Sequence, residues 1–130
     1  MKLTNTQMST YLYSLEQIAP KTQGKLAYAI AKNMRKLENE LIEYNDIKNK
    51  TLAKYGTADE NGIYSLKVDG SEAFQKFAEE MQPYNNDVSD VSITMVDPDD
   101  VYKAGLNGTE TMQILFMIKD EEEEKDNDIE

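Results

Sequence analysis

The chain of 130 residues contains neither cysteine nor histidine. Without cysteine it can form no disulfide and no zinc–thiolate site, and it has no thiolate nucleophile. Without histidine it lacks the commonest general base and the usual nitrogen ligand of zinc, copper and iron. Any catalysis would have to run on carboxylates, lysines, tyrosines or hydroxyls. We therefore expect a protein that binds rather than catalyses, with no cofactor and no metal.

Long apolar runs are also missing. The run Ile114–Ile118 is far shorter than the roughly 20 residues that cross a bilayer. The segment Met1–Gln7 has no apolar stretch behind its lysine and does not resemble a signal peptide. Apolar residues form 39% of the chain and charged residues 30%, which suits one domain with a polar surface. We expect a cytoplasmic protein without a membrane partner.

The net charge of −11 is distributed unevenly along the chain. Residues 1–56 carry nine Lys/Arg and five Asp/Glu, whereas residues 57–130 carry five and twenty. The last stretch, 119–130, holds eight acids and two lysines, and we expect it to be a disordered acidic tail. Because an acidic protein repels phosphate, direct nucleic-acid binding is not expected.

Two helices are predicted in the front half. The first spans 5–18, with Thr4 and Gln7 forming a capping box and Pro20 ending the run. The second spans about 23–55 without a proline and stops at Gly56. A helix of that length is close to 50 Å long, against about 20 Å for the first. The pair is predicted to form a helical hairpin with one very long helix.

This difference in length leaves part of the apolar stripe of the second helix uncovered. The residues concerned are Leu41, Tyr44, Leu52 and Tyr55. The back half, a second copy or a partner could cover them, and we assign them to an oligomer interface, with a homodimer as one form. The lysines on the opposite side of this helix could follow phosphates, face solvent or dock onto the acidic half of the protein itself.

The back half predicts a small sheet with short helices. Residues 59–62 form a turn signal, and 63–68 and 91–95 alternate like strands. A helix that Ser71 caps and that ends near Pro83 lies between them, and another runs from Pro98 to about Ala104. The apolar run 112–118 is ambiguous, and Thr109 as a cap favours a helix. The fold class is α+β: one domain over 1–118, with the helical hairpin at 1–56 and a two- or three-stranded sheet with short helices at 57–118.

Five aspartates form the strongest candidate site, namely Asp87, Asp90, Asp97, Asp99 and Asp100. They could gather a hard cation. A capping role fits better, because Asp97 precedes Pro98 and two acids follow in the first helical turn. The pattern also lacks the central glycine and final glutamate of a calcium loop. We assign the five aspartates to an acidic partner-binding surface whose carboxylates imitate phosphates.

Several segments resemble a group of small proteins of unknown function from phages and prophages of Gram-positive bacteria. They are Tyr-Ala-Ile-Ala-Lys-Asn-Met-Arg-Lys-Leu-Glu-Asn-Glu-Leu at 28–41, Lys-Tyr-Gly at 54–56, Asp-Glu-Asn-Gly at 59–62 and Phe-Met-Ile-Lys-Asp-Glu-Glu at 116–122. The resemblance covers most of the chain before the tail, and 83–110 matches loosely. It implies a virus-encoded protein in a bacterial host cytoplasm and carries over no catalytic residue.

Three classes of function follow. The first is an anti-defence inhibitor, a DNA mimic that occupies the basic groove of a host nuclease or another nucleic-acid-binding protein. The second is a phage structural or assembly factor, or a chaperone, that oligomerises through the long helix. The third is a carboxylate–metal hydrolase, which the missing histidine and cysteine make the weakest of the three. The charge asymmetry favours the first class.

Overall fold

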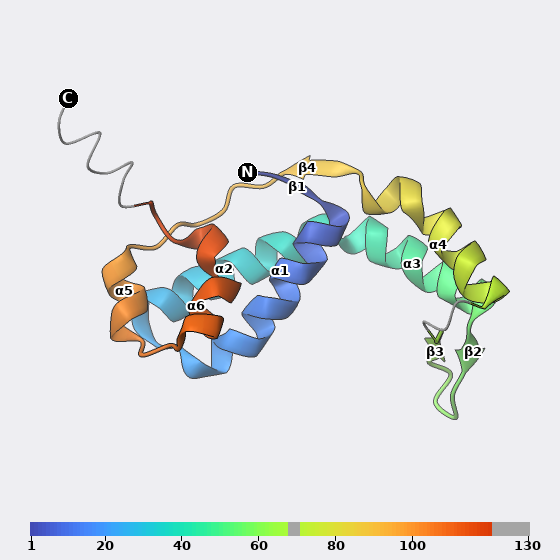
Figure 1. Cartoon of the computed structure of the whole chain (residues 1–130), viewed down its shortest axis with the longest axis horizontal. Coiled ribbons are helices and arrows are strands. Elements are labelled where there is room, and N and C mark those ends of the chain that lie inside the picture. Colours follow the sequence, from blue (N-terminus) through green and yellow to red (C-terminus); the bar gives the residue numbers. More distant parts are fainter. Residues whose placement is uncertain (68–70, 121–130) are drawn as a thin grey trace.

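The computed structural model describes residues 1–67 and 71–120 (Figure 1). Four helices of 14 to 17 residues form most of the molecule: α1 (Asn5–Ile18), α2 (Gly24–Glu40), α3 (Ile42–Tyr55) and α4 (Glu72–Asn85). Shorter elements complete it: β1 (Lys2–Thr4), η1 (Ala19–Lys21), β2 (Thr57–Ala58), β3 (Tyr64–Ser65), β4 (Val88–Asp90), α5 (Pro98–Lys103), α6 (Gly108–Gln113) and η2 (Leu115–Met117). The fold is mainly helical with two small pairs of strands, which agrees with the α+β class in its coarse form.

The start of α1 confirms the predicted capping box. The Thr4 hydroxyl accepts a hydrogen bond from the Gln7 backbone N–H at 3.1 Å, and the Gln7 side chain accepts one from the Thr4 N–H at 2.8 Å. These bonds satisfy two backbone groups that a helix start leaves without partners. After α1, Pro20 lies in the 3-10 turn η1, and Gly24, with φ of +65°, begins α2. The chain thereby reverses, and α1 packs against α2.

The prediction of one very long helix is wrong. The run 23–55 is divided at Leu41, which has φ −91° and ψ 0° and lies between α2 and α3. The Leu41 N–H donates to both the Leu37 and the Glu38 carbonyls, so the helical turn tightens there without a proline or glycine. Figure 1 shows the change of direction at this point. The break lets α2 pack on α1 while α3 packs on α4.

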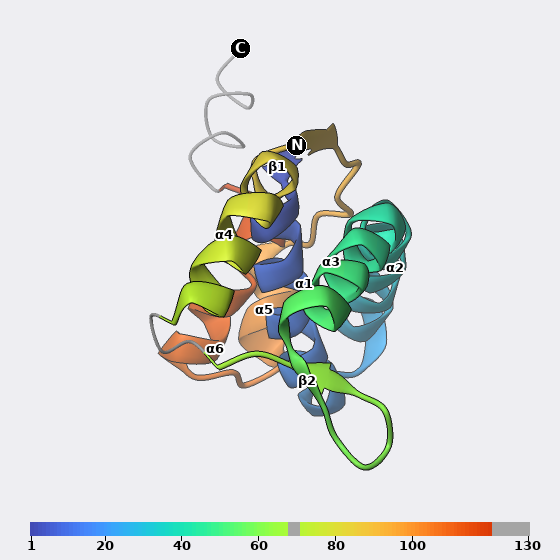
Figure 2. The same ribbon diagram turned by 90° about the vertical axis from the view of Figure 1, so that its right-hand side faces the viewer.

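Helix α4 supplies the cover that α1 is too short to give. Its predicted Ser71 cap is confirmed, since the Ser71 hydroxyl accepts from the Phe74 N–H at 3.2 Å. The helix continues through Pro83 to Asn85, beyond the predicted end. Figure 2 shows α3 and α4 side by side. Two polar contacts join them: the Tyr44 hydroxyl donates to Asn85 Oδ1 at 2.6 Å, and Lys54 pairs with Glu80 at 2.7 Å.

The strands differ from those predicted. In the predicted strand 63–68, the described residues end at 67, and among them only Tyr64–Ser65 is a strand, which pairs with β2 in an exposed antiparallel hairpin. The second predicted strand, 91–95, is not a strand, although the Val91 N–H donates to the Met1 carbonyl at 2.8 Å, and the strand β4 lies just before it and pairs with β1. The two predicted strands therefore share no sheet. The turn at 59–62 is confirmed, because the Asp59 carboxylate accepts from the Asn61 and Ile63 N–H groups and Gly62 has φ of +79°.

The stretch 91–97 docks on α2 through side chains instead of through a strand partner. The amide of Asn33, which is fully buried, donates to the Thr94 carbonyl at 3.0 Å and accepts from the Thr94 N–H at 2.7 Å. One turn further along α2, the Lys36 ammonium donates to the Ser92 carbonyl and to the Thr94 hydroxyl. These contacts replace the strand hydrogen bonds that the alternating pattern led us to expect.

The same stretch also holds the C-terminal elements. The Val96 N–H donates to the Met117 carbonyl at 2.8 Å, and its carbonyl accepts from the Lys119 N–H at 2.9 Å. The ring of Phe116 in η2 stacks on Tyr11 of α1, with centroids 4.0 Å apart. Met117 is buried beside Asn33, and the Met117 sulfur lies 3.6 Å from the Asn33 amide nitrogen. The C-terminal elements are therefore fixed to α1 and α2.

The ambiguous run 112–118 is resolved into the end of α6 and the 3-10 turn η2. The cap of α6 is Asn107 rather than Thr109, and Asn107 forms a capping box with Glu110. The predicted helix at 98–104 is confirmed as α5. A hydrophobic core runs through β1, α1 to α4, the 91–96 stretch, α5, Ile114 and η2. In the predicted tail, residues 121–130 lie outside the described residues.

Replacement of Asn33 by alanine is expected to lower the free energy of unfolding by about 2–4 kcal/mol. The Thr94 N–H and carbonyl both lose their partner, and an unsatisfied buried polar group costs about 1–3 kcal/mol. Urea unfolding followed by circular dichroism measures the change. Asn39→Ala is the control, since Asn39 is an exposed asparagine on the same helix. Equal stabilities for the two variants would contradict this account.

Candidate partner-binding surfaces

The residues assigned to an oligomer interface lie largely inside the single chain. Leu41 is 1% exposed and Tyr44 is 8% exposed, whereas Leu52 and Tyr55 are half-buried. Burial raises the pKa of Tyr44, and the Tyr55 hydroxyl donates to the Glu80 carboxylate. Helix α4 packs along this face. The back half of the same chain therefore covers this face. The difference in helix length is explained without a second copy of the chain.

The five predicted acidic residues do not form one cluster. Asp87 and Asp90 lie at β4, and the other three lie at the start of α5, beyond the extended stretch (Figure 1). Asp90 pairs with the N-terminal ammonium at 3.0 Å, and Asp97 pairs with Lys119 at 3.1 Å. Asp97 is the N-cap of α5, as predicted, but its side chain makes no capping hydrogen bond.

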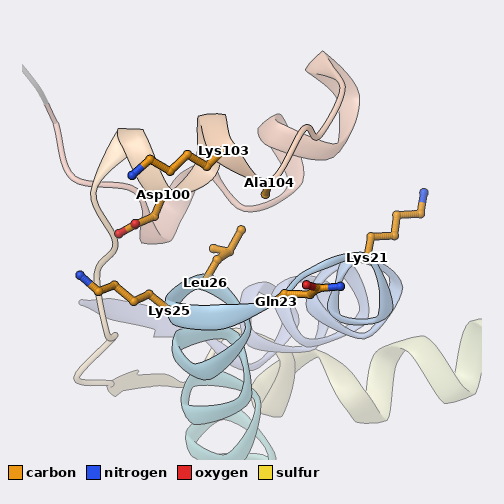
Figure 3. A pocket seen from close by; sticks show the side chains of 7 residues that line it. All are labelled: Lys21, Gln23, Lys25, Leu26, Asp100, Lys103 and Ala104. Carbon is orange, nitrogen blue, oxygen red and sulfur yellow. The ribbon is translucent and has the colours of Figure 1, made fainter.

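Asp100 lines a hollow of about 350 Å³ between the start of α2 and α5. Figure 3 shows the side chains of Lys25 from α2 and of Asp100 and Lys103 from α5 extending to the left of the view, whereas Lys21 lies at the right and points away from the hollow. Two lysines here flank one aspartate, which reduces the negative field that Asp100 would present to a basic partner. Among the five predicted residues, Asp87 and Asp99 are the exposed ones that form no ion pair within the described part of the chain.

Some of the carboxylates form ion pairs with lysines of the same chain. Glu80 on α4 pairs with Lys54 on α3, and Glu110 on α6 pairs with Lys21 of η1. The hydrogen bond from Lys54, with a second from Tyr55, lowers the pKa of Glu80, and the bond to Glu80 raises the pKa of Lys54. The hydrogen bond from Lys21, with another from the Asn107 backbone, lowers the pKa of Glu110. Lysines of the front half thus dock partly onto the acidic back half.

An apolar groove lies between α5 and η2, and we call it the α5–η2 groove. Its volume is about 640 Å³. Its lining is Pro98, Val101, Tyr102, Gly105, Leu106, Thr111, Leu115 and Ile118. Tyr102 is 87% exposed and Leu115 is 60% exposed, with Met112 nearby in sequence at 75%. Large apolar side chains gathered around a groove in this way are typical of a protein-docking surface.

Local geometry explains why these side chains remain uncovered. Pro98, Val101, Tyr102 and Gly105 follow the i, i+3, i+4, i+7 spacing of one helical face. Helix α5 is six residues long, and Gly105, with φ of +70°, turns the chain away from it. The chain then returns through α6 and η2, where Thr111 and Leu115 line the groove together with the residues of α5. The face is therefore walled on one side and left open on the other.

Sequence reasoning missed this groove and also missed Asn33. The groove is built from elements of three to six residues, which are too short for a clear apolar period. Asn33 could have been found, because it follows Ile30 by three residues and precedes Leu37 by four, and so lies on the apolar face of its helix. A polar residue on such a face needs a hydrogen-bonding partner from another element.

No protein-family model, curated protein or solved structure matches this chain. Within residues 1–67 and 71–120, no three Asp or Glu side chains lie close enough together to hold a metal ion. In that same part of the chain, no helix combines the length and apolar character needed to cross a membrane. What the described geometry offers chemically is an apolar groove beside an acidic segment.

Replacement of Glu80 by glutamine is expected to destabilise the protein at neutral pH and to have a smaller effect in acid. Since the pKa of Glu80 is lowered on folding, its ion pair stabilises the fold above the ordinary glutamate range, near 4.3. That contribution is lost as the pH falls through the lowered folded-state pKa. Urea unfolding at pH 7 and at about pH 3 measures both differences.

The matched control is Glu79→Gln, one residue earlier on α4, where the side chain is exposed. This variant is expected to leave stability almost unchanged at both pH values. A destabilisation by Glu80→Gln that is the same at both pH values would show that the ion pair with Lys54 does not contribute.

Proposed function

We propose that the chain is a non-enzymatic protein-binding protein whose partner docks on the α5–η2 groove. The observation that carries this proposal is the exposure of Tyr102 and Leu115 around an apolar groove of about 640 Å³. Water contact with such side chains is unfavourable, and a partner that covers them gains the corresponding free energy, about 25 cal/mol per Å² of apolar surface. A tyrosine at the rim suits an interface, because its ring is rigid and its hydroxyl remains hydrogen-bonded.

We further propose that the partner is basic, such as a host nuclease or another nucleic-acid-binding protein. The charge of −11 supports this, because opposite charges raise the rate of association and disfavour acidic partners. The resemblance of 28–41 and 116–122 to phage and prophage proteins supports a host target in a bacterial cytoplasm. The scattered positions of the five aspartates favour docking by an apolar contact with acidic surroundings over imitation of a phosphate backbone.

The assembly-factor alternative draws less support from the geometry. It relied on a stripe along the second helix that would need a second copy to cover it. Leu41 and Tyr44 are buried beneath other elements of the same chain, and Tyr55 is hydrogen-bonded to Glu80. The α5–η2 groove is the apolar surface to which we assign the partner.

Affinity capture from lysate of a Gram-positive bacterium tests the proposed function. The bait is the full chain, either unchanged or carrying Tyr102→Ser or Leu115→Ser. We expect a partner to be retained by the unchanged chain and depleted roughly tenfold with each variant, because truncating a central anchor side chain costs more than about 1 kcal/mol. Quantitative mass spectrometry measures the retained amounts.

The control baits are Tyr13→Ser and Ile42→Ser. Tyr13 is 63% exposed and Ile42 is 60% exposed, and both lie on other helices. They are expected to retain the partner fully. If the groove variants capture the same proteins as the unchanged chain, or if no protein is captured at all, the proposed function is wrong.

A further inference from the structure

We infer that the α5–η2 groove binds a basic amphipathic helix, one with an apolar face flanked by lysines or arginines. This inference rests on the proposed function and adds the chemistry of the docked segment. Three observations carry it. One wall of the groove is helical, the backbone groups of the nearby extended segment already form hydrogen bonds within the chain, and the segment around the groove carries a net negative charge.

The wall of the groove presents a helical surface. On α5, Pro98 and Tyr102 lie four residues apart on one face above the buried Val101, and Leu115 and Ile118 line the other side of the groove. Apolar side chains at this spacing form a ridge, and a ridge packs into the space between side chains of another helix. A volume of about 640 Å³ accommodates a few side chains from one face of a docked helix.

An extended peptide would need free backbone groups along an edge, and the nearest extended backbone has already used them. The Val96 N–H and carbonyl bond to Met117 and Lys119, respectively, and the Ile118 N–H bonds to Leu115. Strand addition depends on a row of unpaired N–H and carbonyl groups. A helix satisfies its own backbone and needs the groove only for its side chains.

The charge around the groove determines which residues should flank the apolar face of the docked helix. Residues 97–120 hold five acids and two lysines, a net charge of −3. Asp97 and Glu110 already pair with lysines of the chain, whereas Asp99 on α5 is exposed and forms no ion pair within the described residues. Lysine or arginine beside the apolar face of the docked helix would complement Asp99 and the net negative charge of this segment. A second copy of the chain is disfavoured as the occupant, since each copy carries −11.

The probe that tests this inference is a synthetic peptide of leucine and lysine, about four helical turns long, with leucines at i, i+3, i+4 and i+7. We expect it to bind the unchanged full chain and to shift the amide signals of Tyr102, Leu106 and Leu115 in NMR spectra. Tyr102→Ser and Leu115→Ser should each weaken binding roughly tenfold or more. Tyr13→Ser should leave the dissociation constant unchanged.

All three substitutions conserve charge, so a peptide held only by electrostatic attraction would bind them equally, and that result would overturn the inference. Two further peptides test its parts. A peptide in which glutamate replaces lysine should bind much more weakly, and equal binding would refute the basic partner. A peptide that alternates leucine and lysine, as a strand does, should also bind more weakly, and equal binding would refute the helix.

The outcome can be separated from that of the proposed function. If the groove variants lose a captured protein but the leucine–lysine peptide does not bind, this inference fails and the proposed function stands. If the variants capture the same proteins as the unchanged chain, the proposed function fails whatever the peptide does.

Discussion

The paired hydrogen bonds between the Asn33 amide and the Thr94 backbone determine how the back of the chain is placed on the front. Asn33 lies on the buried face of α2, and its amide meets both the N–H and the carbonyl of Thr94, as a strand partner would. Two residues later, Val96 holds Met117 and Lys119 by backbone hydrogen bonds. The position of η2, and hence one wall of the α5–η2 groove, follows from that connection. A buried polar contact of this kind fixes one arrangement because every alternative leaves polar groups without partners.

Charge has a second role in this architecture. The basic front half and the acidic back half meet at Lys54–Glu80 and Lys21–Glu110, which join α3 to α4 and η1 to α6. Exposed ion pairs of this kind add little stability, but opposite charges on the two halves favour the observed docking over other arrangements. The groove lies in the back half, where acids remain in excess. The same asymmetry therefore assists the fold and selects the kind of partner.

Local signals in the sequence were read correctly where one short-range interaction decides the structure. The capping box of Thr4 and Gln7, the Ser71 cap and the turn at 59–62 all depend on neighbouring residues.

Features set by tertiary contacts could not be predicted in this way. The break at Leu41 involves no proline or glycine and accompanies the packing of α3 on α4. The alternating residues 91–95 suggested a strand, but their polar partners are side chains of α2. The five aspartates were close in sequence, and the intervening extended stretch separates them.

The central claim is that Asn33 holds the 91–97 stretch on α2, and the exchange rate of the Thr94 amide hydrogen tests it most directly. Thr94 lies outside every helix and strand, so without Asn33 its N–H would exchange at the rate of an open loop. Hydrogen–deuterium exchange followed by NMR should show the Thr94 N–H protected nearly as strongly as the buried amides of α2, with the exposed Ser92 and Met95 exchanging much faster. Rapid exchange at Thr94, equal to that of Ser92 and Met95, would contradict the claim.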